Sequence, residues 1–474
     1  MRKKKAVNKF SIKEFYKSKI FIFISLGFFI FFIIGSMSII YSENEFFFNI
    51  KKKIPTSIKK PIKKIFYFTI IERENKDLKN EIYEKNRKII KLNNRVASLE
   101  SDLYAGKKIS EEIIELDNIN FHLKKIFLPY TNLSNKKNIK NGYLALFEDN
   151  LIIVYWSGKI ISININELTK DQLEIFEIDS NLSNFVKQND KFISIKDTLI
   201  INDTMFVSYT KNISKDNCLN ISIAKTQIKN LERLKFEDFF TYKDCLKGRF
   251  GGYQAGGRLE KFKENKLLLS TGDFQNFGPS QKLDNNFGKV ISIDMETKKT
   301  NFLSLGHRNP QGLLYLEKRN ILMSTEHGQK GGDEINKILL NENKIPNYGW
   351  PISSYSDYYG YEDFEIRKKA PLYKSHEKYG FIEPIKYFTP SLGISQLVEA
   401  KNFNNNFNEN TLIVSSLKNK KLYFLEFNND FSNVVSQNSI EVGERIRDIV
   451  KFQNDKYLLF LEGTPALGIL SINY

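Results

Sequence analysis

The sequence predicts a large all-β domain that follows an N-terminal transmembrane helix and a helical coiled-coil segment. Three observations support this organisation. A long uncharged apolar run lies near the N-terminus, a heptad repeat follows it, and short apolar runs alternate with turn residues over the rest of the chain. The 39 Phe and 23 Tyr residues among the 474 are enough to fill a large core.

The apolar run covers residues 20–41 and contains no charged side chain. Its length of about 22 residues is sufficient for a helix to cross a hydrocarbon layer of ~30 Å. A cleaved signal peptide has a shorter apolar core and a small-x-small cleavage site, and neither is present here. We therefore expect a single-pass signal anchor in the inner (cytoplasmic) membrane. Residues 1–19 would be a cytoplasmic basic tail, and the C-terminal domain would be periplasmic.

The net charge of +17 does not indicate a nucleic-acid-binding protein, because it is concentrated at one end of the chain. Residues 1–64 contain 15 Lys and Arg and 3 acidic residues, a net charge of +12. A basic tail beside an apolar segment is typical of a membrane flank. The basic juxtamembrane linker, residues 42–70, is expected to lie on anionic lipid headgroups.

Residues 71–105 show a heptad repeat in which Lys85 alone interrupts the apolar positions. The Leu-rich set is expected at heptad position d and consists of Ile71, Leu78, Leu92 and Leu99. The β-branched set is expected at position a and consists of Asn75, Ile82, Ile89, Val96 and Leu103. This combination favours a parallel two-stranded coiled coil, with Asn75 fixing the register. The alternative is a single amphipathic helix that packs on its own domain. We expect the parallel homodimer.

From about residue 142 the hydrophobic period changes to that of β-strands. Runs such as YLALFEDNLIIVYWSGKIISI read as strand, tight turn and strand, and the pattern continues to the C-terminus. Many short strands over so long a segment fit a sandwich, a barrel or a propeller, and the pattern gives no blade count.

Two cysteines, Cys218 and Cys245, are present and form no CxxC motif, so a zinc or thioredoxin-like site is not expected. In an oxidising compartment they would form one disulfide. The alternative is a pair of unlinked, half-buried thiols. The sequence leaves both interpretations open.

The candidate chemistry is concentrated between residues 256 and 359. In GHRNPQG, a proline fixes a turn while Arg308, Asn309 and Gln311 offer donors suited to carboxylates or carbonyl oxygens. In GGDEIN, Asp333 and Glu334 place two carboxylates in a glycine-rich loop, a ligand type that suits Ca²⁺. The glycine-rich loops lie between strands, which excludes a P-loop or a Rossmann fingerprint.

Taken in order, GGRLEKF, STGD, GKVISID, GHRNPQG, GGDEIN and NYGWP resemble the soluble PQQ-dependent glucose/sorbosone (aldose sugar) dehydrogenase family. The resemblance covers roughly residues 140–474 of the predicted domain 120–474 and is strongest over 250–351. It implies a six-bladed β-propeller with an active site at one end of the central channel. It also implies a sugar substrate, the cofactor PQQ and bound Ca²⁺.

The resemblance carries the family's cofactor contacts to positions in several blades. These are Arg308, Asn309, Gln311, Thr389, Ser391, Lys418, Arg445 and Arg447. For calcium, it implies backbone carbonyls at Gly328 and Gln329. A second, structural calcium would use Glu334 and the Tyr348 carbonyl, with Asp357 or Glu383, and Asp333 belongs to the same loop.

At one position the chain departs from the family pattern. The family has a histidine before the GRL turn that acts as general base, and an aspartate 19 residues later that orients it. Here Asp273 is present, but Gln254 stands at the histidine position, and an amide does not take up a proton near neutral pH. Three interpretations follow: an active dehydrogenase with another base, for which His327 is a candidate; a propeller that binds the cofactor without oxidising sugar; or an unrelated scaffold of the cell envelope, dimerised by its coiled coil.

Overall fold

The computed structural model describes residues 75–89, 92, 96, 99, 103–129, 141–186, 194–214, 218–247, 251–340, 343–400, 407–453 and 456–472. The chain divides into two compact units, Met1–Asn93 and Asn94–Tyr474. In the first unit, the described residues 75–89 form an α-helix within the predicted coiled coil. Its apolar side chains Leu78, Ile82 and Ile89 are exposed. The pairing of two such helices remains a prediction.

The predicted anchor, residues 20–41, and the linker 42–70 lie outside the described residues. Among the residues that are described, no helix is both long enough and apolar enough to cross a bilayer.

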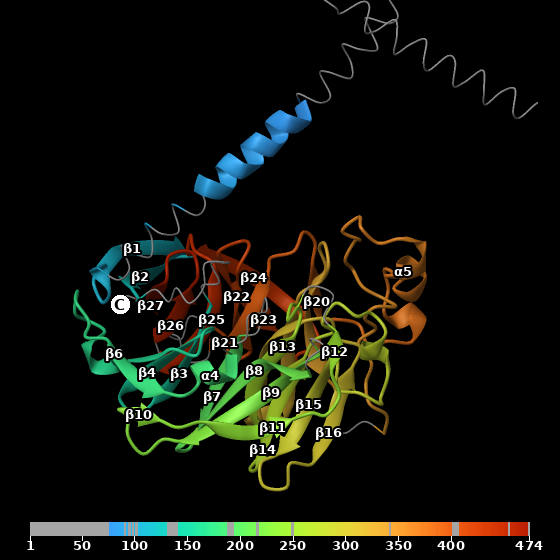
Figure 1. Ribbon diagram of the computed structural model, residues 1–474, viewed down its shortest axis with the longest axis horizontal. Helices are drawn as coiled ribbons and strands as arrows, with labels where there is room; N and C mark the ends of the chain where they lie inside the picture. Colours follow the sequence, from blue (N-terminus) through green and yellow to red (C-terminus); the bar gives the residue numbers. More distant parts are fainter. Residues whose placement is uncertain are drawn as a thin grey trace, which may run out of the picture. The chain divides into compact units, whose positions relative to one another are not determined.

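The described residues of the second unit form six sheets that are arranged around the molecule (Figure 1). We number them as blades 1 to 6. In order across each sheet, blade 1 contains β3 (Gly142–Phe147), β4 (Asn150–Tyr155), β5 (Ile160–Asn164), β6 (Phe176–Ser180) and β10 (Arg233–Leu234), and blade 2 contains β7 (Ile195–Ile201), β8 (Thr204–Ser214), β9 (Cys218–Gln227) and β11 (Glu237–Thr241), with β12 (Leu246–Lys247) also paired to β9. Blade 3 contains β13 (Gly256–Phe262), β14 (Lys266–Thr271), β15 (Lys289–Asp294) and β16 (Thr300–Leu305), and blade 4 contains β17 (Pro310–Leu316), β18 (Ile321–Glu326), β19 (Asp333–Ile338) and β20 (Lys386–Phe388). Blade 5 contains β21 (Ile394–Glu399), β22 (Thr411–Ser416), β23 (Lys421–Phe427) and β24 (Val434–Glu441), and blade 6 contains β25 (Ile446–Gln453), β26 (Lys456–Leu461), β27 (Ala466–Ile472), β2 (Ile119–Phe127) and β1 (Lys108–Leu116).

Short helical segments lie in the connections between strands. They are α4 (Ser183–Val186), α5 (Phe364–Lys369) and the 3₁₀ turns η1 (Ile165–Glu167), η2 (Pro279–Gln281), η3 (Glu317–Arg319) and η4 (Glu377–Tyr379).

The first strands of the six blades form a closed ring. β3 contacts β7, β7 contacts β13, and the series continues through β17, β21 and β25 back to β3. The fold is therefore a six-bladed propeller with these strands around its central channel, which confirms the predicted fold.

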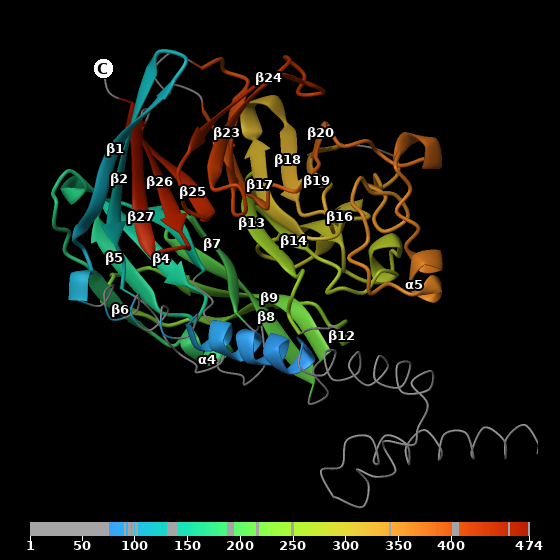
Figure 2. The ribbon, with the colours of Figure 1, turned by 90° about the horizontal axis from the view of Figure 1, so that it is seen from above.

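The ring is closed by strands from opposite ends of the unit. β2 pairs with β27 from Phe121↔Ile472 to Phe127↔Ala466. Figure 2 shows the hairpin β1–β2 beside the red C-terminal strands. This hairpin begins before residue 120, where the sequence analysis placed the start of the domain. β1 (KISEEIIEL) is largely exposed, so it carries little of the apolar alternation that marks the other strands.

The core lies between neighbouring blades. For example, Leu268 and Val290 of blade 3 pack with Leu313 and Leu322 of blade 4. Central strands such as β14 are therefore buried along most of their length. Stacking of adjacent sheets, rather than one central core, holds the ring together.

The inner strands share an irregularity that positions the site. In β7, β17 and β25 the second residue is an extra residue in the pairing with the next strand: Lys196, Gln311 and Arg447, respectively. β13 and β21 have wider irregularities at the same place, whereas β3 pairs regularly. A β-bulge changes the direction of a side chain and is common beside active sites. The three bulge residues therefore lie at equivalent places, at one end of the channel.

Candidate active site

A single arginine spans the channel. Arg258 of β13 donates through Nη1 to Asp197 of β7 (2.9 Å) and to Asp448 of β25 (2.8 Å). Its Nε donates to the Gln311 carbonyl (2.6 Å) and its Nη2 to the Arg447 carbonyl (3.0 Å). One guanidinium from blade 3 thus fixes blades 2, 4 and 6. Its last two bonds hold the backbone of two predicted cofactor contacts.

The two carboxylates of this group are deeply buried, at 3% exposure for Asp197 and 2% for Asp448. Each also accepts from a backbone N–H, of Leu259 and Leu144 respectively. Burial raises the pKa of both carboxyls, that of Asp197 to about 7, while the guanidinium of Arg258 acts in the opposite direction. We call Asp197, Arg258 and Asp448 the charged hub.

The predicted arginines of blade 6 share one carboxylate. Arg445 donates to Glu462 Oε2 (3.0 Å), and Arg447 donates to Glu462 Oε1. Arg447 Nη1 also reaches Gln311 Oε1 of blade 4 (3.0 Å). Two cations thus face one anion, so the group retains a positive charge at the channel end. Glu462 was not identified from the sequence.

Gln254 occupies a well-defined place between two charged groups. Its amide, oriented by its neighbours, donates to Asp273 Oδ1 (2.9 Å) and accepts from Arg308 Nη2 (2.7 Å). Asp273 also accepts from the Trp350 indole (2.8 Å) and from the Gln275 amide (2.8 Å). Burial raises the pKa of Asp273 to about 7, against the attraction of Arg308. The structure therefore brings Gln254, Asp273 and Arg308 together, with the amide as a bridge.

His327 is held by both ring nitrogens. Its Nε2 is 2.6 Å from the Ile394 carbonyl, so this nitrogen carries a proton. Its Nδ1 lies 3.4 Å from Asn309 Nδ2. Burial lowers its pKa, and Asp333 acts in the opposite direction. The ring is therefore a neutral imidazole that braces the GHRNPQG loop, with its Nδ1 facing the Asn309 amide.

Asn309 and Arg308 also bind the backbone of the site. Asn309 Oδ1 accepts from the Gly256 amide (3.2 Å), and Arg308 Nη1 donates to the carbonyls of His327 (2.9 Å) and Gly328 (2.5 Å). These bonds hold the blade 3 and blade 4 loops together.

Three of the predicted calcium ligands, Gly328, Glu334 and Tyr348, line one small pocket together with His376. Several side chains of this region bond to other groups of the protein, although Gln329 Oε1 has no hydrogen-bond partner among the described residues. Asp333 accepts from the amides of Gly328, Gly393 and Ile394, and His376 lies 3.4 Å from Glu334. Gln329 donates to Glu362. Within the described part of the chain, no group of three or more His, Cys, Asp or Glu could hold a metal. The described side chains thus form no calcium site, and the carbonyl ligands at Gly328 and Gln329 stay a prediction.

The remaining predicted contacts are more exposed. Thr389 accepts from the Gly332 amide (3.3 Å), and Ser391 is half-buried. Lys418 is exposed and follows Leu417, whose carbonyl accepts from Arg445 Nη1 (3.4 Å). Lys418 therefore lies beside the arginine pair in the chain, with its side chain open to solvent.

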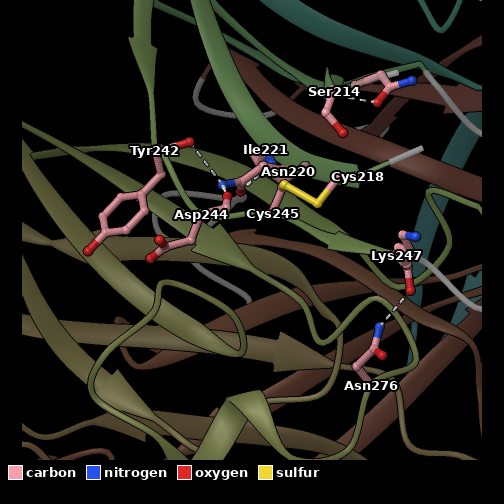
Figure 3. Close-up of a disulfide and its surroundings, with 10 residues drawn as sticks. Ser214, Cys218, Asn220, Ile221, Tyr242, Asp244, Cys245, Lys247 and Asn276 are labelled. Atoms are coloured by element: carbon pink, nitrogen blue, oxygen red, sulfur yellow. Dashed lines mark hydrogen bonds between the residues drawn. A yellow bond between two sulfur atoms is a disulfide. The ribbon is translucent and has the colours of Figure 1, made fainter. Parts of the chain in front are cut away.

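A disulfide links Cys218 of β9 to Cys245, which resolves the alternative left open by the sequence (Figure 3). Beside it, Asn220 donates to the carbonyls of Tyr242 and Asp244. Asn276 donates to the Lys247 carbonyl (3.3 Å). These contacts anchor the segment 242–247, which precedes the loop that carries Gln254.

The hub and Lys196 were missed by sequence reasoning. Arg258 stands in the GGRL motif, but its partners lie 61 and 190 residues away in the chain. Lys196 shows no local signal, because its place depends on a bulge that only strand pairing defines.

The propeller is similar to solved sugar dehydrogenases. A soluble aldose sugar dehydrogenase of Escherichia coli in its apo form superimposes with a TM-score of 0.56 at 20% identity, over 70% of this chain and 95% of that one. A PQQ-bound aldose sugar dehydrogenase of Streptomyces coelicolor gives 0.53 at 16% identity, over 78% and 100%. At these identities the likeness concerns the fold.

Curated relatives match parts of the sequence. An aldose sugar dehydrogenase of Escherichia coli is 27% identical over 252 residues, 50% of this chain and 65% of the relative. An uncharacterised protein of Synechocystis is 27% identical over 224 residues, 42% and 51%. Quinoprotein glucose dehydrogenase B of Acinetobacter calcoaceticus is 48% identical over 59 residues, 12% and 11%. The chain thus spans between about a half and two thirds of the first two relatives. The sequence profile of the Glucose / Sorbosone dehydrogenase family matches residues 193–466, more than half of the chain, so the protein belongs to that family.

Proposed function

We propose that this protein is a PQQ-dependent aldose dehydrogenase, which oxidises a sugar hydroxyl with transfer of hydride to PQQ. One observation carries the proposal: Arg445 and Arg447 converge with Gln311 at one end of the channel, where two cations share the single carboxylate of Glu462. The names of the relatives, which include a quinoprotein and aldose sugar dehydrogenases, support the same chemistry.

The donor set fits the cofactor. PQQ carries three carboxylates and an ortho-quinone, and several arginines and a lysine match that charge. Arg447, Arg445 and Lys418 would bind carboxylates, and Gln311 and Asn309 would add neutral donors. When bound, PQQ supplies a two-electron acceptor for hydride.

The protein's own residues would position the substrate. Asp273 and Arg308 hold the Gln254 amide from two sides, so this amide offers one fixed polar group to a sugar hydroxyl. The Trp350 indole fixes Asp273 and stacks near Arg308, whose guanidinium carbon lies 5.3 Å from the ring centre. Such a bonded network keeps its geometry as substrate enters.

The test is calorimetric titration of the full chain in detergent with PQQ. We expect saturable binding that weakens about 10- to 100-fold in Arg447→Gln, because a charged hydrogen bond is lost. Arg233→Gln is the matched control, since Arg233 is an exposed arginine on β10. Loaded protein should then reduce an artificial dye with at least one aldose. Binding that is absent, or equal in wild type and Arg447→Gln, would overturn the proposal.

A second candidate follows from Gln254. Because both polar atoms of its amide are bonded and neither is a base, the propeller could bind the cofactor without turnover. It would then be a non-catalytic binding or scaffold protein of the cell envelope. Tight PQQ binding without dye reduction across a panel of sugars would favour this function.

We also propose that residues 20–41 anchor the protein in the inner membrane with the propeller on the periplasmic side, and that residues 71–105 pair two copies in parallel. The charge-free run and the exposed apolar side chains of Leu78, Ile82 and Ile89 support these proposals. A cysteine at Asn75 should cross-link two copies across the coil. A monomer by sedimentation in detergent would contradict the dimer.

A further inference from the structure

Gln254 cannot take the proton that sugar oxidation releases. Gln254 carries an amide, and His327 has a proton on Nε2 that is committed to a carbonyl. Asp273 accepts from Gln254, Gln275 and Trp350, so three of its roughly four acceptor positions are occupied. A hydroxyl that loses hydride must also lose its proton, so another group has to take it.

Lys196 lies at the position that the fold gives to site residues. It is the bulge residue of β7, as Gln311 is of β17 and Arg447 of β25. Its Nζ is 3.4 Å from the Gly252 carbonyl, two residues before Gln254. The amine is therefore at the same end of the channel as the predicted cofactor contacts, beside the loop that bears Gln254.

The packing around the side chain fixes its course. A Cβ on Gly257 of β13 would lie 2.4 Å from Lys196 Cβ, and Gly257 has a φ of +108°. The stem of Lys196 thus occupies the space that a glycine leaves free on the neighbouring blade. This contact directs the amine along β13 toward the Gln254 loop.

Lys196 also differs from the structural lysines of the protein. Lys289 donates to three carbonyls, those of Pro279, Ser280 and Phe287. Lys124 likewise donates to three carbonyls. Among the described residues, Lys196 has one hydrogen bond, and it is long. An ammonium offers three donors, so Lys196 retains capacity for a ligand.

The surroundings favour a neutral amine. Charged or titratable side chains on the neighbouring elements include Asp197 on β7, Tyr143 on β3, Arg258, Glu260 and Lys261 on β13, Tyr209 and Lys211 on β8, Arg447 and Asp448 on β25, and Tyr253 in the adjacent loop. The two aspartates bind Arg258, and Arg447 shares the carboxylate of Glu462 with Arg445, so this arginine pair keeps a net positive charge. Burial, and then the charge of Arg447, lower the pKa of Lys196 to about 7.

We propose that Lys196 is the general base of this enzyme, in place of the residue that Gln254 replaces; the assignment rests on the proposed function. In the reaction the C–H and O–H bonds at the sugar's C1 break and a C=O bond forms. The ortho-quinone cofactor, when bound, would accept the hydride with both electrons. The proton passes to the Lys196 amine, which becomes an ammonium and returns the proton to solvent.

The first test needs no cofactor. The full chain in detergent is labelled with acetic anhydride at pH values from 5 to 11, and each lysine is quantified by mass spectrometry. We expect half-maximal labelling of Lys196 near pH 7, and the exposed Lys318 serves as the control for the reactivity of the reagent. A midpoint above pH 9, or no labelling at any pH, would overturn the assignment.

The second test is kinetic. We expect Lys196→Met and Lys196→Arg to lower kcat about 10²- to 10⁴-fold, because Arg retains the charge but is not a base. PQQ affinity should change less than about fivefold in Lys196→Arg. Adding Gln254→His to Lys196→Met should restore at least tenfold in kcat, and the rising limb of the pH–rate profile near pH 7 should be lost in Lys196→Arg.

Two kinetic outcomes would contradict the role of Lys196. One is a Lys196→Arg variant within threefold of wild type, and the other is a loss of PQQ affinity that matches the loss of rate. Failure of the proposed function would give a different result, because the wild-type protein would then not bind PQQ. The labelling midpoint is independent of that result.

Discussion

The charged hub and the Lys196–Gln254 region lie at the same channel and differ in how completely their polar groups are bonded. In the hub, Arg258 has four partners from three other blades, and each aspartate has the guanidinium and a backbone amide. Lys196, by contrast, has a single long bond to a carbonyl. A group whose hydrogen-bonding capacity is fully used within the protein is suited to holding the blades together. A group with unused hydrogen-bonding capacity is suited to contacting a ligand.

The largest effect should follow from breaking the hub. Arg258→Met leaves two buried carboxylates without their cation, which should cost about 3–5 kcal/mol in the free energy of unfolding measured with urea. The matched control is Arg233→Met, whose ion pair with Asp179 is exposed, and it should cost less than about 1 kcal/mol.

A compensating variant sharpens the same point. Adding Asp197→Asn and Asp448→Asn to Arg258→Met removes the unpaired charges while keeping oxygens for the Leu259 and Leu144 amides. This triple variant should recover much of the lost stability. A single Arg258→Met variant as stable as wild type would show that the hub does not hold the blades.

The contrast also separates what the sequence could predict from what it could not. Strands such as β3–β5 and the GHRNPQG loop are determined by nearby residues, so local patterns indicated them. The hub depends on partners from β7 and β25, which come together only when the ring closes through β2 and β27. Lys196 depends on a bulge, and a shift of one residue in pairing redirects a side chain. Long-range closure and register were therefore beyond a single sequence.

The arrangement of the side chains in the predicted calcium loop also depends on strand register. The sequence shows Asp333 and Glu334 as two adjacent carboxylates, but strand alternation directs neighbouring side chains to opposite faces. Asp333 binds the amides at the start of β21, while Glu334 meets His376.

Removing the disulfide should have the next largest effect on stability. The Cys218→Ser/Cys245→Ser variant loses the cross-link between positions 27 residues apart, which should cost about 3 kcal/mol. Because the bridge lies beside the segment that leads to Gln254, sugar turnover should fall as well. Urea unfolding and dye reduction measure the two effects. Wild-type protein treated with reductant should behave in the same way as the variant, and unchanged stability in both would show that the bridge contributes nothing.

The smallest effect concerns the pH dependence of the free energy of unfolding. It tests whether the Lys196 amine, which has few hydrogen bonds, is neutral in the folded protein. The pKa of Lys196 is about 7 in the folded protein and about 10.4 in an unfolded chain, so between these values the unfolded chain binds more protons. Stability should therefore rise with pH in this window and fall as pH is lowered toward 7. From pH 7 to pH 8 the contribution of Lys196 is about 1 kcal/mol. Urea unfolding of wild type and Lys196→Met at the two pH values isolates it, because Lys289 and all other groups are common to both proteins. Equal pH dependence in the two would mean that the Lys196 amine is already protonated in the folded protein, as a saturated structural lysine would be.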